Sequence, residues 1–254
     1  MPPRRPALLA WAALALLAAG CVPAEPDPDA GRPAEARGFP RADRPVSPVI
    51  STQFSTEDQR ERLGEANMVM DLAQIGAGSS VADIGAGEGY YTVRLAARVG
   101  PTGRVLAEDI DAAASARLGR RVEQERLDNV SIRTGTPADP KLPDASFDRV
   151  FMVHMYHEVA EPYAFLWRLR PSLRLGGSVI VVDSDRPTDQ HGTPPELLFS
   201  EFAALGFRLS EFVRKPEVTG YYAKFEAAGP RPAPAAIRPC RLGANGAAAR
   251  RDGK

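Results

Sequence analysis

The sequence predicts an α/β domain in which a mostly parallel sheet is covered by helices on both faces. Apolar segments of strand length alternate with segments of helix length over residues 56–226, and this alternation is typical of parallel sheets. A glycine-rich segment, residues 85–89, directly follows the first strand and opens the next helix. Glycines at that place let the backbone approach a ligand closely. We therefore expect a doubly wound domain with a ligand loop.

Seven segments have the length and composition of strands. Five of them alternate with helices, namely residues 81–84, 104–107, 130–133, 148–153 and 178–183. The last two, residues 208–213 and 221–226, are separated only by a loop that contains Pro216 and Gly220. Strands joined by a short loop pair in antiparallel fashion. The expected sheet thus has seven strands and ends in an antiparallel pair.

The helices are expected at residues 56–75, 91–99, 112–127, 162–173 and 195–205. In the first of them, apolar residues from Leu63 to Ile75 recur at helical spacing, which suits a helix packed on a sheet. Gly76 and Gly78 follow directly and predict its end.

The two ends of the sequence differ in composition from its middle. Residues 22–50 are rich in Pro, Ala, Asp and Arg and almost lack large apolar residues, so we expect a flexible linker there. Residues 229–254 have a similar composition, and we expect a disordered tail. This leaves residues 51–228 for the folded domain.

Residues 1–21 resemble an export signal. Arg4 and Arg5 precede an apolar run over residues 7–19, and small residues lead to Cys21. Residues 17–21, Leu-Ala-Ala-Gly-Cys, resemble a bacterial lipobox, in which the cysteine carries lipid. The resemblance implies an exported lipoprotein that is anchored in the membrane through lipid on Cys21 and faces the periplasm. The alternative is a cytoplasmic protein whose apolar N-terminus is not used as a signal.

Charge and cysteine content argue against a nucleic-acid partner and against a cysteine-based metal cluster. Lys plus Arg and Asp plus Glu both number 32, so the net charge is zero and no overall field attracts phosphates. We therefore expect no nucleic-acid partner. Besides Cys21 the sequence holds only Cys240, which is too few thiols for a cysteine-based metal cluster.

The spacing of the glycines restricts the ligand. A dinucleotide-binding loop needs a third glycine at position 90, where the sequence has Tyr90, and the third glycine comes one residue earlier. Asp83 and Glu88 would also disfavour a pyrophosphate, whereas a cationic, amine-bearing ligand tolerates them. A nicotinamide-dependent oxidoreductase is therefore disfavoured.

Four segments resemble the class I S-adenosylmethionine-dependent methyltransferases: residues 81–89, 105–111, 142–148 and 175–183. The resemblance implies a Rossmann-like fold, S-adenosylmethionine as the cofactor and transfer of its methyl group. No further compact domain is left to recognise protein or RNA, so a small-molecule methyl acceptor is expected.

The resemblance also implies which residues bind the cofactor. Asp109 matches the acidic residue that binds the ribose hydroxyls, with Glu108 and Asp111 as neighbours able to replace it. Thr136 follows the glycine after which many relatives carry an acidic residue that contacts adenine, so its hydroxyl or the main chain is expected to make that contact. The implied cofactor-binding residues are Asp83, Gly85, Gly87, Gly89, Asp109 and Thr136.

Candidate catalytic residues follow the fourth strand. Two of the three histidines, His154 and His157, stand there beside Tyr156 and Glu158, and the carboxyl edge of such a sheet faces its ligand. We interpret His154 or His157 as a general base and Tyr156 as a residue of the substrate pocket. The structural alternative is that His157 and Glu158 cap the next helix and that His154 forms local hydrogen bonds.

A metal site at His157 and Glu158 would need a third ligand, for which His191 or Asp183 would have to come close, and we expect no metal. His191 begins either a substrate loop or the next helix.

Two functions remain for this sequence. One is a methyltransferase. The other is a non-catalytic lipoprotein that uses the same fold to bind a ligand, because S-adenosylmethionine is made in the cytoplasm and an exported domain would be separated from it.

Overall fold

The computed structural model describes residues 27, 29–49, 57–215, 220–242 and 248–249. The chain divides into two units, Met1–Gly31 and Arg32–Lys254, and every element described below belongs to the second. The export signal predicted at residues 1–21, with Cys21, lies outside the described residues. Among the helices of the described ranges, none combines the length and the apolar character needed to cross a bilayer.

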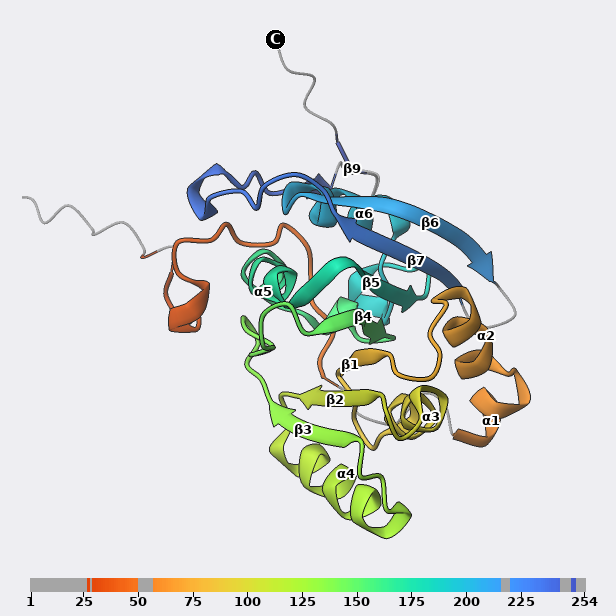
Figure 1. The fold of residues 1–254 in the computed structure, drawn as a ribbon. Helices are drawn as coiled ribbons and strands as arrows, with labels where there is room; N and C mark the ends of the chain where they lie inside the picture. The colour runs from red at the N-terminus through yellow and green to blue at the C-terminus, as the bar shows by residue number, and fades with distance from the viewer. Residues whose placement is uncertain (1–26, 28, 50–56, 216–219, 243–247, 250–254) are drawn as a thin grey trace, which may run out of the picture. The chain divides into compact units, whose positions relative to one another are not determined.

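A seven-stranded sheet forms the centre of the domain (Figure 1). Its spatial order is β3-β2-β1-β4-β5-β7-β6. Neighbours from β3 to β5 pair in parallel, whereas β7 pairs antiparallel with both β5 and β6. The strands are β1 Ser80–Ile84, β2 Arg104–Asp109, β3 Val130–Thr134, β4 Phe147–Val153, β5 Leu173–Asp183, β6 Phe207–Lys215 and β7 Gly220–Ala227. The predicted fold class is thereby confirmed.

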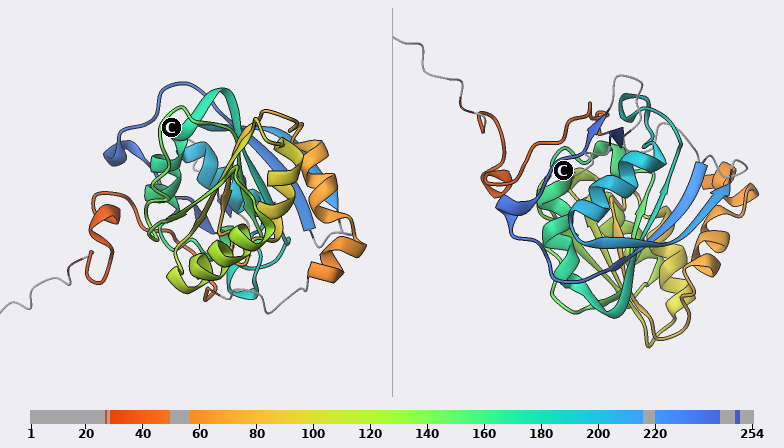
Figure 2. Two further views of the ribbon diagram at one scale, coloured as in Figure 1. Left: turned by 60° about the horizontal axis from the view of Figure 1, so that its bottom comes forward. Right: turned by 90° about the horizontal axis from the view of Figure 1, so that it is seen from above.

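Helices cover both faces of this sheet (Figure 2). α2 (Glu65–Leu72) and α3 (Tyr90–Val99) share one buried apolar cluster with Phe151 of β4. α5 (Pro162–Leu169) and α6 (Pro195–Ala204) share another with Val150, the preceding residue of the same strand. Successive side chains of a strand point to opposite faces, so a strand of continuous apolar character serves both layers.

The remaining described elements are short, apart from α4. α4 (Ala112–Glu125) packs on β2 and β3 through a small apolar cluster that includes Leu118. The others are α1 Glu57–Arg62, the 3₁₀ turns Ala34–Ala36, Tyr156–Glu158, Arg170–Ser172, Thr188–Gln190 and Pro234–Ala236, and the strand pair β8 Arg241–Leu242 and β9 Ala248–Ala249.

The helix predicted at residues 56–75 is divided into α1 and α2. Gly64, between them, has φ +62° and forms the N-cap of α2. This left-handed conformation is readily accessible to glycine and cannot continue a right-handed helix. The break sets α1 apart as a separate short helix, and its residues Glu57, Arg60 and Arg62 line the cavity described below.

Residues 32–49 pack against the domain, so the predicted flexible linker over residues 22–50 is wrong for this part. Two buried arginines anchor the segment: Arg32 donates two hydrogen bonds to the Glu161 carboxylate at 2.9 and 2.6 Å, and Arg44 donates one to Glu201 at 3.0 Å. Its low content of apolar residues predicts disorder, but the segment is fixed by paired buried charges, which composition does not reveal. The folded domain therefore begins at Arg32 rather than at residue 51.

Part of the predicted disordered tail is also packed. The indole of Trp167 donates to the Pro232 carbonyl at 2.8 Å, and the Cys240 amide donates to the Tyr163 hydroxyl at 2.7 Å. Ile237 is only 4% exposed. Backbone groups make most of these attachments, and their partners cannot be read from the composition of the tail.

Candidate active site

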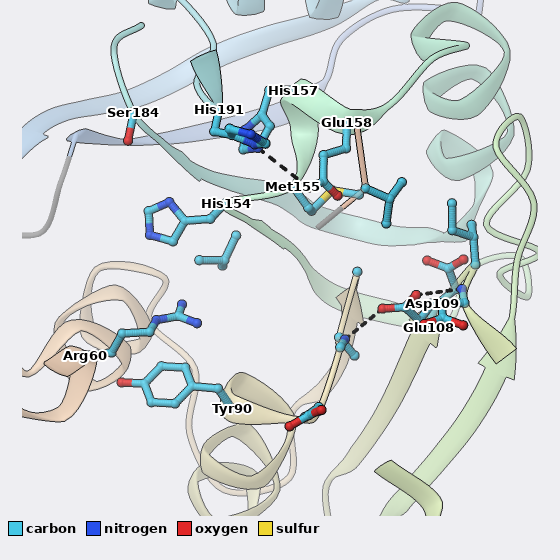
Figure 3. A pocket seen from close by; sticks show the side chains of 18 of the residues that line it. Arg60, Tyr90, Glu108, Asp109, His154, Met155, His157, Glu158, Ser184 and His191 are labelled. Carbon is cyan, nitrogen blue, oxygen red and sulfur yellow. Dashed lines mark hydrogen bonds and ion pairs between the residues drawn. The ribbon is translucent and has the colours of Figure 1, made fainter. Parts of the chain in front are cut away.

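A cavity of about 900 Å³ opens at the carboxyl ends of the parallel strands (Figure 3). The helices that follow β1 and β4, α3 and α5, pack on opposite faces of the sheet. The chain therefore leaves these two adjacent strands toward opposite faces of the sheet. The crevice that forms between such connections, at the topological switch point, is the ordinary ligand site of an open α/β sheet. The cavity has the size of a small-molecule site.

Backbone conformation favours glycine at all three glycines of the loop after β1. All three have positive φ, +68° at Gly85, +55° at Gly87 and +89° at Gly89. A Cβ on Gly89 would lie 2.4 Å from Leu118 of α4, so helix packing excludes a side chain there. A Cβ on Gly87 meets no atom within 4 Å. Gly87 borders the cavity, so its bare backbone is open to a ligand.

Asp109 ends β2 beside this loop and holds it in place. Its carboxylate accepts hydrogen bonds from the amides of Gly87 and Asp111, both at 2.8 Å. The side chain is 8% exposed and lines the cavity. A carboxylate has about four acceptor positions, so Asp109 has capacity left for two hydroxyl donors of a ligand.

Two neighbouring carboxyl groups are buried close to Asp109. Burial raises the pKa of Glu108 to about 8, and the charge of Asp109 adds to the shift. Burial likewise raises the pKa of Asp83 to about 6, although the hydrogen bond from Thr92 opposes it. Glu108 lines the cavity, and its Oε1 has no hydrogen-bond partner among the described residues. A cationic ligand would stabilise the ionised form of this group.

The whole cavity wall is rich in acidic side chains. Its arginines are Arg60, Arg62 and Arg186. Its acidic residues are Glu57, Glu65, Glu88, Glu108, Asp109, Asp111 and Glu158. This balance fits a ligand with sulfonium and ammonium charges and does not fit a pyrophosphate.

His154 lines the cavity beyond the end of β4 and is paired with a buried glutamate. Its Nε2 lies 3.3 Å from Glu65 Oε2 in α2. Glu65 also accepts from Arg60 at 2.6 Å. Although burial disfavours ionisation of Glu65, the hydrogen bond and charge of His154, together with Arg60, lower its pKa to about 2. Glu65 is therefore a carboxylate at neutral pH and fixes the orientation of His154.

His157 is fixed by a second buried carboxylate. Its Nδ1 lies 3.0 Å from Asp183 Oδ1 and 3.1 Å from Oδ2. Asp183 is fully buried at the end of β5, where it also accepts from the Thr193 hydroxyl at 2.7 Å and the Ser184 amide at 2.8 Å. A carboxylate beside Nδ1 makes that nitrogen the proton carrier. Nε2 remains as the acceptor, and the residue lies in the cavity wall.

His191 and Glu158 lie next to His157 in the same wall (Figure 3). The rings of His157 and His191 meet edge to face with centroids 5.5 Å apart. Glu158 Oε1 lies 4.0 Å from His157 Nε2. The structure thus places His191, which could not be located from the sequence, beside the pair His157 and Glu158.

Most of the residues predicted from the sequence meet at this cavity. Of the residues expected to bind a cofactor, Gly85, Gly87, Asp109 and Thr136 border it, as do the catalytic candidates His154 and His157.

Three predicted site residues do not line the cavity. Tyr156 is fully buried and donates its hydroxyl to Glu201 at 2.6 Å, so its placement in a substrate pocket is wrong. Asp83 lies inside β1 and accepts from Thr92, and Gly89 is covered by Leu118. Both residues support the loop and do not line the cavity.

Sequence reasoning missed Arg60 and Glu65. Both lie in the region predicted as one long helix, where charged residues are ordinarily assigned to the solvent side. The break at Gly64 turns them toward the cavity, and no sequence motif marks that change of direction.

Residues 81–177 match the family model of a methyltransferase domain. The chain is 30% identical over 122 residues to a ubiquinone/menaquinone biosynthesis C-methyltransferase of Hahella chejuensis, an alignment that covers 47% of this chain and 49% of that protein. It is 34% identical over 117 residues to a nocamycin O-methyltransferase of Saccharothrix syringae, with 44% and 41% covered. The chain thus spans about half the length of these curated relatives or less.

The fold is similar to that of an S-adenosylmethionine-dependent methyltransferase from Aquifex aeolicus. The TM-score is 0.60 at 22% identity, with 66% of this chain and 91% of that chain covered. The likeness concerns the fold. The segment that matches the methyltransferase domain model, residues 81–177, contains the glycine loop, Asp109, His154 and His157.

Proposed function

We propose that this chain is an S-adenosylmethionine-dependent methyltransferase that acts on a small molecule. The observation that carries the proposal is a single cavity bordered both by the glycine loop with Asp109 and by the two carboxylate-held histidines. The match of residues 81–177 to a methyltransferase domain supports it.

In this proposal the loop side of the cavity holds the cofactor. The amides of the glycine loop and the N-terminus of α3 approach the amino-acid part, and Asp109 accepts from the ribose hydroxyls. The acidic wall balances the cofactor's positive charges. When bound, S-adenosylmethionine supplies an electrophilic methyl group, so the protein has to align the acceptor and exclude water.

The histidine side is proposed to hold the acceptor. Glu65 orients His154, so this histidine is the candidate to take a proton from an acceptor hydroxyl or amine as its oxygen or nitrogen attacks. The two curated relatives are named for quinone biosynthesis and for nocamycin, both small molecules. These names support an acceptor of that size without identifying it.

Calorimetric titration with S-adenosylmethionine and S-adenosylhomocysteine tests the cofactor site. We expect saturable binding that Asp109→Ala weakens at least tenfold, about 1.4 kcal/mol, because the ribose loses its acceptor. Gly87→Ala should weaken binding similarly, since its Cβ would project into the space that the ligand needs.

Gly176→Ala is the matched control for Gly87→Ala. Gly176 also has positive φ, +78°, and free space at its Cβ, but it does not line the cavity. Both variants carry a similar backbone strain of roughly 1–2 kcal/mol, and only Gly87→Ala should lose ligand. Absence of binding at millimolar cofactor would refute the proposal. Binding without methyl transfer to any candidate acceptor would instead support the non-catalytic lipoprotein.

We also propose that the protein is exported and anchored through lipid on Cys21. The basis is the order of residues 4–21, a basic start, an apolar run and small residues before the cysteine. A cytoplasmic protein in which this segment is not processed is the alternative.

A further inference from the structure

We propose that His157, Glu158 and His191 form a binding site for a divalent transition-metal ion in the cavity wall. The ligand atoms offered by these three residues all lie within 4.8 Å of one another. In a tetrahedral zinc site, bonds of about 2.0–2.2 Å place two ligand atoms about 3.4 Å apart. Small side-chain rotations therefore suffice to close the three groups around one ion.

The donor set is chemically suited to such an ion. Two imidazoles and one carboxylate bind Zn²⁺ in open catalytic sites and Fe²⁺ in related ones. Three protein ligands leave at least one coordination position open. That position faces the cavity, because all three residues line it.

Asp183 provides an independent observation that points to a metal. Histidine ligands usually donate their second ring nitrogen to a carboxylate, which fixes the tautomer and makes the ligand more basic. His157 has this arrangement, with Nδ1 on the buried Asp183 and Nε2 4.0 Å from Glu158. The cap of a helix would not require a buried carboxylate behind the imidazole.

Ser47 of the packed N-terminal segment holds both histidines at their main chain. Its amide donates to the His157 carbonyl at 3.2 Å, and its hydroxyl accepts from the His191 amide at 3.2 Å. Ser47 is 2% exposed. The two imidazole ligands, 34 positions apart in the sequence (191 minus 157), are thus held together by a third element, as a preorganised site requires.

The role of the ion rests on the proposed function. An ion at this place would bind an acceptor that has an ionisable hydroxyl beside a second oxygen donor, and would lower the pKa of that hydroxyl. The hydroxyl proton passes to His154, the base named in the proposed function, the oxygen forms its bond to the methyl carbon, and the bond from that carbon to the cofactor sulfur breaks. The acceptor class is therefore an oxygen chelator.

Titration with Zn²⁺ alone tests the site without any cofactor. The full-length chain is freed of metal by a chelator, carries no histidine tag, and has Cys21→Ser and Cys240→Ser so that no thiol binds the ion. We expect one Zn²⁺ per chain. His191→Ala and Glu158→Gln should each weaken it at least tenfold, and Asp183→Asn by roughly 10–100-fold.

His154→Gln is the matched control. It removes the remaining histidine of the chain, which lines the same cavity outside the cluster, and the amide can still bond to Glu65. We expect its Zn²⁺ affinity to match the parent. The proposal is overturned if the parent takes up no Zn²⁺ at about 0.1 mM free ion, or if His154→Gln loses as much Zn²⁺ affinity as His191→Ala. Circular dichroism checks the fold of each variant. If Asp183→Asn does not fold, the Zn²⁺ affinity of His191→Ala tests the proposal instead.

The same protein separates this proposal from the cofactor site. Binding of S-adenosylhomocysteine is measured in the presence of a chelator, so it reports the loop side alone. Cofactor binding without Zn²⁺ uptake overturns the metal site and leaves the methyltransferase proposal standing. Zn²⁺ uptake without cofactor binding overturns the methyltransferase proposal and leaves the metal site standing.

Discussion

Glu108 illustrates how one buried carboxyl can make stability depend on pH. It is 1% exposed, and burial together with Asp109 raises its pKa to about 8 from the ordinary 4.5. The folded protein therefore favours the neutral form. The preference of the folded state for protonated Glu108 contributes to the free energy of unfolding. This contribution is fully present below pH 4.5 and is lost as the pH rises through about 8.

Glu108→Gln should remove this loss, because the amide cannot ionise. Without cofactor, we expect the melting temperature of the variant to rise relative to the wild type between pH 5 and pH 9. The gain should be a few degrees, since 1 kcal/mol corresponds to roughly 2–4 °C for a chain of this size. Thermal melts followed by circular dichroism measure it.

Glu88→Gln is the control, since Glu88 lies exposed on the glycine loop after β1 and pairs with Arg117. Its melting temperature should follow the wild type at every pH. Parallel curves for Glu108→Gln and the wild type would mean that Glu108 does not ionise in this range.

Sequence reasoning located residues well where a motif ties them to the backbone. Gly85, Gly87 and Asp109 come together at the cavity because a loop after one strand and an acid at the end of the next are adjacent in any parallel sheet. Tyr156 was misplaced because the four residues after β4 turn about His154, whose φ is +54°. A non-glycine residue in that conformation has no sequence signal.

At the scale of elements, the seven strands could be predicted because each is a short apolar run between breakers. The N-terminal segment could not. Its hold on the domain comes from Arg32 and Arg44, whose partners Glu161 and Glu201 lie more than one hundred positions away. Pairing over that distance leaves no local pattern.

Arg44→Ala tests the energetic weight of this segment. Both side chains of the Arg44–Glu201 pair are almost fully buried, at 0% and 1% exposure. Removal of one partner leaves an uncompensated charge, which typically costs about 3–5 kcal/mol. We expect a loss of that order in the free energy of unfolding, measured by urea denaturation.

Arg37→Ala, an exposed arginine of the same segment, is the comparison. It should change the free energy of unfolding by less than about 0.5 kcal/mol. Equal and small effects of both substitutions would show that the segment is not anchored as the structure has it.

At the scale of the whole molecule, the proposed lipid anchor restricts where the domain can lie. A lipid anchor at Cys21 would leave only ten positions before the folded unit begins at Arg32 (22 to 31). In an extended chain these span at most about 35 Å. The proposed anchor would therefore keep Arg32, the first residue of the folded unit, within about 35 Å of a membrane surface.

Metabolic labelling with palmitate tests the anchor. The wild type should incorporate label and sediment with membranes, and Cys21→Ser should lose the label, because the thiol is the only acceptor that the lipobox resemblance provides. Cys240→Ser should keep it. An unlabelled wild type recovered in the cytoplasm would favour the alternative in which the N-terminus is not processed.

The packed segment 32–49 also matters for anyone who trims the chain to obtain the folded domain alone. A start at residue 51, which composition alone recommends, would delete Arg32, Arg44 and Ser47 together. Glu161 and Glu201 would then remain as buried charges, and His157 and His191 would lose the residue that hydrogen-bonds to the main chain of both. Such a truncated protein would report on a damaged site, so an inactive fragment would say nothing about the intact chain.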